Sequence, residues 1–156
     1  MNYGILENQL SSDSVSHIEE FDQFLSDLNI SPNDVCLLGT TTLSVLNIAP
    51  NSDLDFIASK NVRNRIDEFA KNSSDARMNK NGMAYIGENI DLLMEDRLCL
   101  GPYNFGITDE QIISSSDYHF RVSKYKFLRP ELTLSMKGVK HRKKINGTLM
   151  RSSPLG

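Results

Sequence analysis

The 156-residue sequence has no tryptophan, only two cysteines, and no apolar run long enough to cross a bilayer. Cys36 and Cys99 lie in apolar surroundings without metal-ligand spacing, which favours free buried thiols over a disulfide framework or a zinc site. The first residues lack a basic start followed by an apolar block, so no signal peptide is expected. Together these absences predict a cytoplasmic protein that is not embedded in a membrane.

Acidic residues are scarce towards the C-terminus. From Arg121 onward the sequence has ten Lys or Arg residues and one acid, Glu131, whereas residues 1–120 carry nineteen acids. A basic end on an acidic body indicates a polyanion near the C-terminal third, either a triphosphate or a nucleic acid. A solubilising tail or a surface that docks a partner protein would have the same composition, and the charge alone does not separate these alternatives.

Hydrophobic periodicity predicts an α/β (α+β) fold in one domain over residues 1–146, followed by a disordered tail over 147–156. Helices are expected over 14–28, 42–47 and 61–71, with a further helix that begins at Pro130. Strands are expected over 35–38, 53–58, 83–86 and 90–94, and in the alternating segments 118–122 and 125–127. The expected architecture is a small, mixed, mostly antiparallel sheet with helices packed on one side and a C-terminal helix closing a nucleotide cleft.

Two aspartates one residue apart, Asp53 and Asp55, lie in the second apolar run. In a strand, side chains two residues apart point to the same face, so these two carboxylates are predicted to project together. Carboxylates held side by side repel one another unless a cation lies between them, and Mg²⁺ prefers such oxygen ligands. Asp91, embedded between Ile90 and Leu92, is costly to bury unless it is paired or metal-bound, although a strand-end acid facing water is an alternative.

A glycine turn precedes the aspartate pair. Gly39 ends the first strand, and Thr40 and Thr41 begin a predicted helix. The start of a helix leaves main-chain N–H groups unpaired, at the positive end of the helix dipole, and therefore suits a phosphate. The Thr40 and Thr41 hydroxyls could add further donors, so the segment predicts a site for a metal-bound nucleoside triphosphate.

Over residues 35–94, and more weakly over 118–145, the sequence resembles the nucleotidyltransferase superfamily typified by DNA polymerase β, in particular its minimal bacterial and toxin–antitoxin members. Gly39-Thr40 takes the place of that family's Gly-Gly or Gly-Ser, Asp53 and Asp55 match its carboxylate pair, and Asp91 matches its third acid. Thr40 departs from the pattern. Lys137, on a helix that starts Pro-Glu, matches a triphosphate-binding lysine loosely, and a solvated surface lysine is the alternative.

The resemblance implies two Mg²⁺ ions at Asp53, Asp55 and Asp91, for which Mn²⁺ could substitute, and transfer of a nucleotide from ATP or another nucleoside triphosphate to an acceptor hydroxyl. It also implies Asp91 as the base. RNA or a tRNA 3′ end is the first expectation for the acceptor, and a protein side chain is the second. The alternative function is a non-catalytic module of the same fold that binds a nucleotide or a partner protein.

Overall fold

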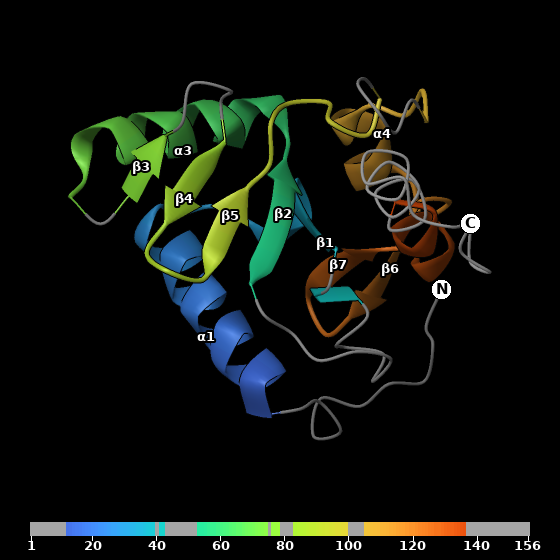
Figure 1. Ribbon diagram of the computed structural model, residues 1–156, viewed down its shortest axis with the longest axis horizontal. Coiled ribbons are helices and arrows are strands. Elements are labelled where there is room, and N and C mark those ends of the chain that lie inside the picture. The colour runs from blue at the N-terminus through green and yellow to red at the C-terminus, as the bar shows by residue number, and fades with distance from the viewer. Residues whose placement is uncertain are drawn as a thin grey trace, which may run out of the picture.

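The computed structural model describes residues 12–39, 41–42, 53–74, 76–78, 83–99 and 105–136. Within these residues a seven-stranded mixed sheet has the order β3-β4-β5-β2-β1-β7-β6 (Figure 1). Four neighbouring pairs are antiparallel, and the pairs β1–β7 and β2–β5 are parallel. The strands are β1 (Val35–Leu38), β2 (Leu54–Ala58), β3 (Ala76–Met78), β4 (Ala84–Ile86), β5 (Ile90–Leu92), β6 (His119–Val122) and β7 (Tyr125–Leu128).

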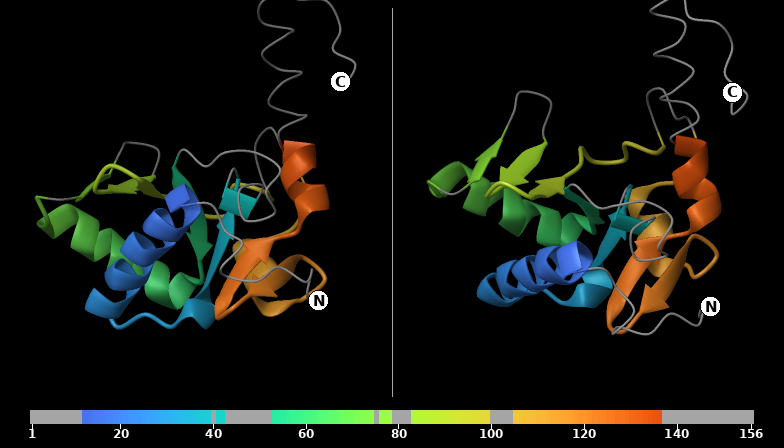
Figure 2. Two further views of the ribbon diagram at one scale, coloured as in Figure 1. Left: turned by 90° about the horizontal axis from the view of Figure 1, so that it is seen from below. Right: turned by 60° about the horizontal axis from the view of Figure 1, so that its bottom comes forward.

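Helices α1 (Ser12–Asp27) and α3 (Lys60–Asn72) cover one face of the sheet, as the views in Figure 2 show. Phe56 of β2 is fully buried there, with its ring centroid 4.8 Å from that of Phe21 in α1. Ile66 of α3 packs into the same core. Alternation along β2 puts Leu54, Phe56 and Ala58 into this core, and therefore turns Asp55 and Ile57 to the opposite face.

The opposite face has a smaller core under helix α4 (Asp109–Ser114) and the helical residues 130–136. Ile112 and Ile113 of α4 pack there with Cys36, Leu38 and Ile57 of the sheet. The prediction that the helices pack on one side of the sheet is therefore wrong. The turn-rich stretch before α4 concealed this helix, although Thr108 and Gln111 form a capping box at its start.

Most of the predicted elements are confirmed. The strand predicted at 35–38 is β1, the one at 53–58 is β2, and the hairpin predicted at 83–94 is β4–β5. Helices predicted at 14–28 and 61–71 correspond to α1 and α3, and a short 3₁₀ helix, η2 (Pro32–Asp34), precedes β1. Strand β3 was not predicted. No helix among the described residues is long and apolar enough to span a membrane.

Both cysteines are free thiols, as expected. Cys36 is fully buried, whereas Cys99 is half-buried. Burial raises the pKa of the Cys36 thiol far above its usual range, so this group is a small apolar core residue and not a nucleophile.

Candidate functional site

Two of the three predicted acids meet across neighbouring strands. Strands β2 and β5 run parallel, and their register pairs Asp55 directly with Asp91. Both side chains are half-buried and lie on the face opposite α1 and α3. Asp91 shares a side-chain hydrogen bond with Asp55. The two carboxyl groups therefore lie side by side, within reach of a single cation.

Asp53, the third predicted acid, is exposed and lies just before β2 begins, so it is not inside the strand as predicted. Its negative charge still reaches the pair. Burial, together with the charge of Asp53, raises the pKa of Asp91 above the usual value for an aspartate, while the hydrogen bond with Asp55 and the charge of Arg77 act in the opposite direction. The three acids therefore interact electrostatically at one end of β2.

The glycine turn lies directly against this pair. Gly39 has a φ of +70°, a conformation that side chains other than glycine rarely adopt. A Cβ at this position would lie 2.8 Å from Asp55 Oδ2, closer than such atoms approach. Glycine at this position therefore allows the main chain at the end of β1 to approach the Asp55 carboxylate.

The threonines after the turn have structural contacts. Thr41 and Thr42 are buried, and the Thr41 hydroxyl donates a 3.4 Å hydrogen bond to the Asp53 carbonyl oxygen. The Thr42 hydroxyl donates to the Leu128 carbonyl oxygen at 3.1 Å. The predicted contact of the Thr41 hydroxyl with phosphate does not fit this arrangement. Its hydroxyl instead ties the turn to the main chain just before β2, which holds Asp53 beside Gly39.

Several predicted features cannot be placed. Thr40 and Lys137, both predicted to contact phosphate, lie outside the described residues. The same is true of most of the helix predicted at 42–47, of the end of the helix that begins at Pro130, and of the tail at 147–156.

Searches against protein-family models, curated proteins and solved structures find no match to this chain.

Oxygen donors alone make up the candidate metal centre. Among the described residues, no group of three or more His, Cys, Asp or Glu side chains is already positioned to hold a metal ion. Asp55 and Asp91 converge, however, and Asp53 is close enough to raise the pKa of Asp91. A set of carboxylates without His or Cys suits a hard cation such as Mg²⁺ and does not suit zinc. The carboxylates of Asp55 and Asp91 therefore suit a hard divalent cation.

Two further side chains extend the line of acids across the sheet. Tyr85 of β4 pairs in register with Asp91, and Arg77 of β3 pairs with Tyr85. The sequence predicted the strand that carries Tyr85, but not the strand that carries Arg77. In β4 the apolar residues Ala84 and Ile86 flank Tyr85, so strand alternation could have predicted that Tyr85 lies on the same face of the sheet as the acids. The three residues of β3 gave no such pattern.

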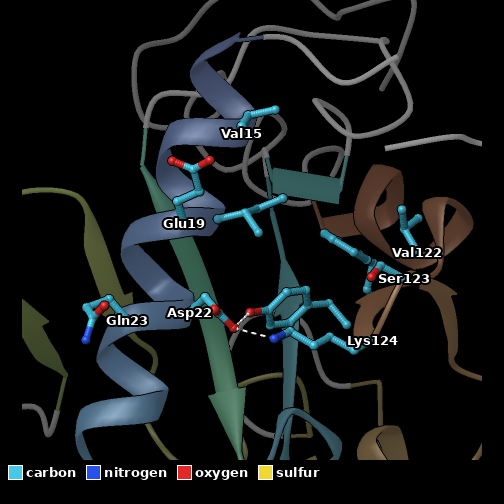
Figure 3. A pocket seen from close by; sticks show the side chains of 10 residues that line it. Val15, Glu19, Asp22, Gln23, Val122, Ser123 and Lys124 are labelled. Carbon is cyan, nitrogen blue, oxygen red and sulfur yellow. Dashed lines mark hydrogen bonds and ion pairs between the residues drawn. The ribbon is translucent and has the colours of Figure 1, made fainter. Parts of the chain in front are cut away.

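A cavity of about 330 Å³ lies between α1 and the β6–β7 hairpin, on the face of the sheet opposite Asp55 and Asp91 (Figure 3). Its walls include Val15, Ile18 and Phe127, and Asp22 forms an ion pair of 2.7 Å with Lys124. Tyr125 donates a hydrogen bond to the same carboxylate. Asp22, Lys124 and Tyr125 therefore have partners within the protein.

Gly39→Ala and Gly106→Ala form a matched test of the turn. Both glycines have a φ of +70°, but a Cβ at Gly106 would meet no described atom within 4 Å. Each variant is expected to lose about 1 kcal/mol of unfolding free energy from left-handed strain. Only Gly39→Ala should displace the Asp55 carboxylate, weaken its hydrogen bond with Asp91 and so raise the pKa of Asp91, measured by carbon-13 NMR. Equal Asp91 pKa values in the two variants would contradict the close contact at Gly39.

Proposed function

We propose that this chain is a metal-dependent nucleotidyltransferase with a polymerase β-like fold, which moves a nucleotide from a nucleoside triphosphate to an acceptor hydroxyl. One observation carries the proposal: Asp55 and Asp91 pair across parallel strands while the Asp55 carboxylate lies against the Gly39 turn. This arrangement brings convergent carboxylates beside a turn whose main-chain N–H groups suit a phosphate. The mixed α/β sheet is consistent with such a fold.

In this proposal the acids at the end of β2 would hold Mg²⁺, with Asp55 and Asp91 as its main ligands and Asp53 beside them. When bound, the cation would offset the negative charge of the triphosphate and make the acceptor hydroxyl more acidic. As a ligand of that cation, Asp55 would help to position the triphosphate, and the phosphates that leave as pyrophosphate would lie at the Gly39 turn. Most of the rate would come from such positioning, because phosphoryl transfer needs little covalent chemistry from the protein.

Asp91 is the group placed to accept the proton of the acceptor hydroxyl. Burial and the charge of Asp53 raise the pKa of this carboxyl, which makes it a stronger base than an ordinary aspartate. In the proposed reaction the acceptor oxygen forms a bond to the α-phosphorus while the bond from that phosphorus to the β-phosphate oxygen breaks. The proton passes to Asp91, and pyrophosphate leaves on the side opposite the acceptor.

The direct test is release of pyrophosphate from each nucleoside triphosphate with Mg²⁺, alone and with bulk tRNA or cell extract. We expect release with at least one triphosphate and acceptor mixture, and loss of that signal in Asp53→Ala. Nucleotide binding without turnover in any mixture would instead support the alternative, a non-catalytic nucleotide- or partner-binding module. Asp53 is a suitable target because its exposed side chain can be shortened with little effect on packing.

A further inference from the structure

Four polar side chains form a row across four strands, on the face away from α1 and α3. In register, Arg77 of β3 faces Tyr85 of β4, Tyr85 faces Asp91 of β5, and Asp91 faces Asp55 of β2. The residues that flank Tyr85 and Asp91 in their strands are buried in the core on the other side of the sheet. Arg77 is exposed, and Tyr85 is half-buried. The row therefore leads from the candidate site to an accessible outer strand (Figure 1).

The order of this row assigns its two ends different roles. Gly39, the proposed phosphate turn, lies on the β1 side of Asp55, whereas Tyr85 and Arg77 lie on the β4 and β3 side of Asp91. In phosphoryl transfer the attacking and leaving oxygens lie roughly in line on opposite sides of the phosphorus. If pyrophosphate leaves towards Gly39, the acceptor hydroxyl must approach from the side of Tyr85.

Tyr85 and Arg77 are residue types that bind single-stranded nucleic acids, through stacking on bases and pairing with phosphates. The Arg77 guanidinium carbon lies 4.8 Å from the centre of the Tyr85 ring, so the two groups form a cation–π pair. A planar guanidinium can pair with a backbone phosphate through its N–H edge and support a base on its face. Two strand spacings, about 10 Å, separate the main chains of Arg77 and Asp91, a distance that one terminal nucleotide can bridge.

We propose that Arg77 and Tyr85 bind the 3′ end of a single-stranded nucleic acid and deliver its terminal hydroxyl to Asp91. Arg77 pairs with a backbone phosphate, and the Arg77–Tyr85 pair supports the terminal base. This inference rests on the proposed function, because it takes the paired carboxylates of Asp55 and Asp91 as the place where the acceptor hydroxyl reacts. It goes further in naming the residues that recognise an acceptor of the class expected from the sequence.

The test measures binding and not turnover, so it does not depend on the proposed chemistry. The probes are a labelled single-stranded oligoribonucleotide with a free 3′ hydroxyl, followed by fluorescence anisotropy, and a fluorescent non-hydrolysable ATP analogue. Arg77→Gln should weaken oligonucleotide binding and lower the slope of log affinity against log salt by about 0.7, the value for one phosphate contact on a single strand. Arg77→Lys should keep the wild-type salt slope but bind more weakly, because lysine retains the positive charge and lacks the planar guanidinium group.

Tyr85 variants test the aromatic half of the site. Tyr85→Leu should weaken oligonucleotide binding about 5-fold or more, the loss expected for removing a stacking ring, whereas Tyr85→Phe should bind like the wild type. Affinity for the ATP analogue should not change in either variant. Arg65→Gln is the control, since Arg65 is an exposed arginine on α3, which covers the opposite face of the sheet.

The outcomes separate this inference from the proposed function. Loss of oligonucleotide binding in Arg77→Gln and Tyr85→Leu, but not in Arg65→Gln, supports the inference even if no pyrophosphate is ever released. In that case the proposed function fails and a nucleic-acid site remains. Equal oligonucleotide binding by Arg77→Gln and Arg65→Gln overturns the inference. The inference is also overturned if Tyr85→Leu binds the oligonucleotide normally and loses affinity for the ATP analogue, because the ring would then support the base of the triphosphate.

Discussion

Asp55→Asn is expected to lower the rate of pyrophosphate release by about 10³-fold while the fold stays intact. The substitution keeps the shape of the side chain and removes the carboxylate that lies next to Asp91 in the register of β2 and β5. A carboxamide binds a divalent cation far less well than a carboxylate, so positioning of the triphosphate beside Gly39 should fail. The measurement is steady-state pyrophosphate release at saturating Mg²⁺, together with the thermal unfolding midpoint of each protein.

Asp117→Asn is the control for that experiment, because Asp117 is an exposed acid in the turn before β6. Its release rate should match that of the wild type. If Asp55→Asn kept full activity, or if both variants lost activity equally, the paired carboxylates would not be the place of the reaction.

The second large effect concerns stability and pH at the contact between α4 and α3. Asp109 of α4 is buried and accepts a 3.0 Å hydrogen bond from the Asp96 main-chain N–H, while Arg63 of α3 lies 3.8 Å away. Its other carboxylate oxygen, Oδ1, is buried without a hydrogen-bond partner among the described residues. Burial raises the pKa of Asp109 to about 6, against the pull of Asp96 and Arg63 and with the help of nearby negative charges.

This raised pKa fixes the sign of the pH dependence. Between about pH 4 and pH 6 the folded protein holds a proton on Asp109 that the unfolded chain releases, so the unfolding free energy falls as pH rises. The contribution is fully present below the ordinary aspartate pKa and is lost as pH rises through about 6, a change of about 3 kcal/mol for one group. Urea unfolding of wild type and Asp109→Asn across this range should show a clearly flatter dependence in the variant.

Asp22→Asn tests a group for which the opposite pH dependence of stability is expected. The Lys124 and Tyr125 hydrogen bonds lower the pKa of Asp22, so this group stabilises the fold above the ordinary aspartate pKa and loses that effect as pH falls. Removing Asp22 should therefore reduce stability at neutral pH and change it little in acid.

For Asp109, a dependence of unfolding free energy on pH that is the same in wild type and Asp109→Asn would contradict the burial of an ionised Asp109.

The main core could be predicted from the sequence because apolar residues recur at regular spacing in its strands and helices. Buried residues alternate along β2, and Val62, Ile66 and Ala70 recur at helical spacing along α3. The face covered by α4 was not readable, because α4 has only six residues and its apolar side chains, Ile112 and Ile113, are adjacent. Two adjacent apolar residues do not define a helical face.

The candidate site was predicted in its residue types and only partly in its geometry. The pairing of Asp55 with Asp91 needed the parallel register of β2 and β5. No local pattern specifies this register, because α3, β3 and β4 lie between the two strands along the chain. The contact between Gly39 and Asp55 depends on the antiparallel pairing of β1 with β2. Long-range register also explains why the contribution of Arg77 was missed.

The central claim is that Asp55 and Asp91 hold a divalent cation beside a triphosphate at the Gly39 turn. A crystal structure of the protein with Mn²⁺ and a non-hydrolysable nucleoside triphosphate tests it most directly. The account predicts an Mn²⁺ ion bound by both carboxylates and a phosphate within hydrogen-bond distance of the main chain at the turn. A nucleotide bound elsewhere, or Asp55 and Asp91 with no ion between them, would contradict it.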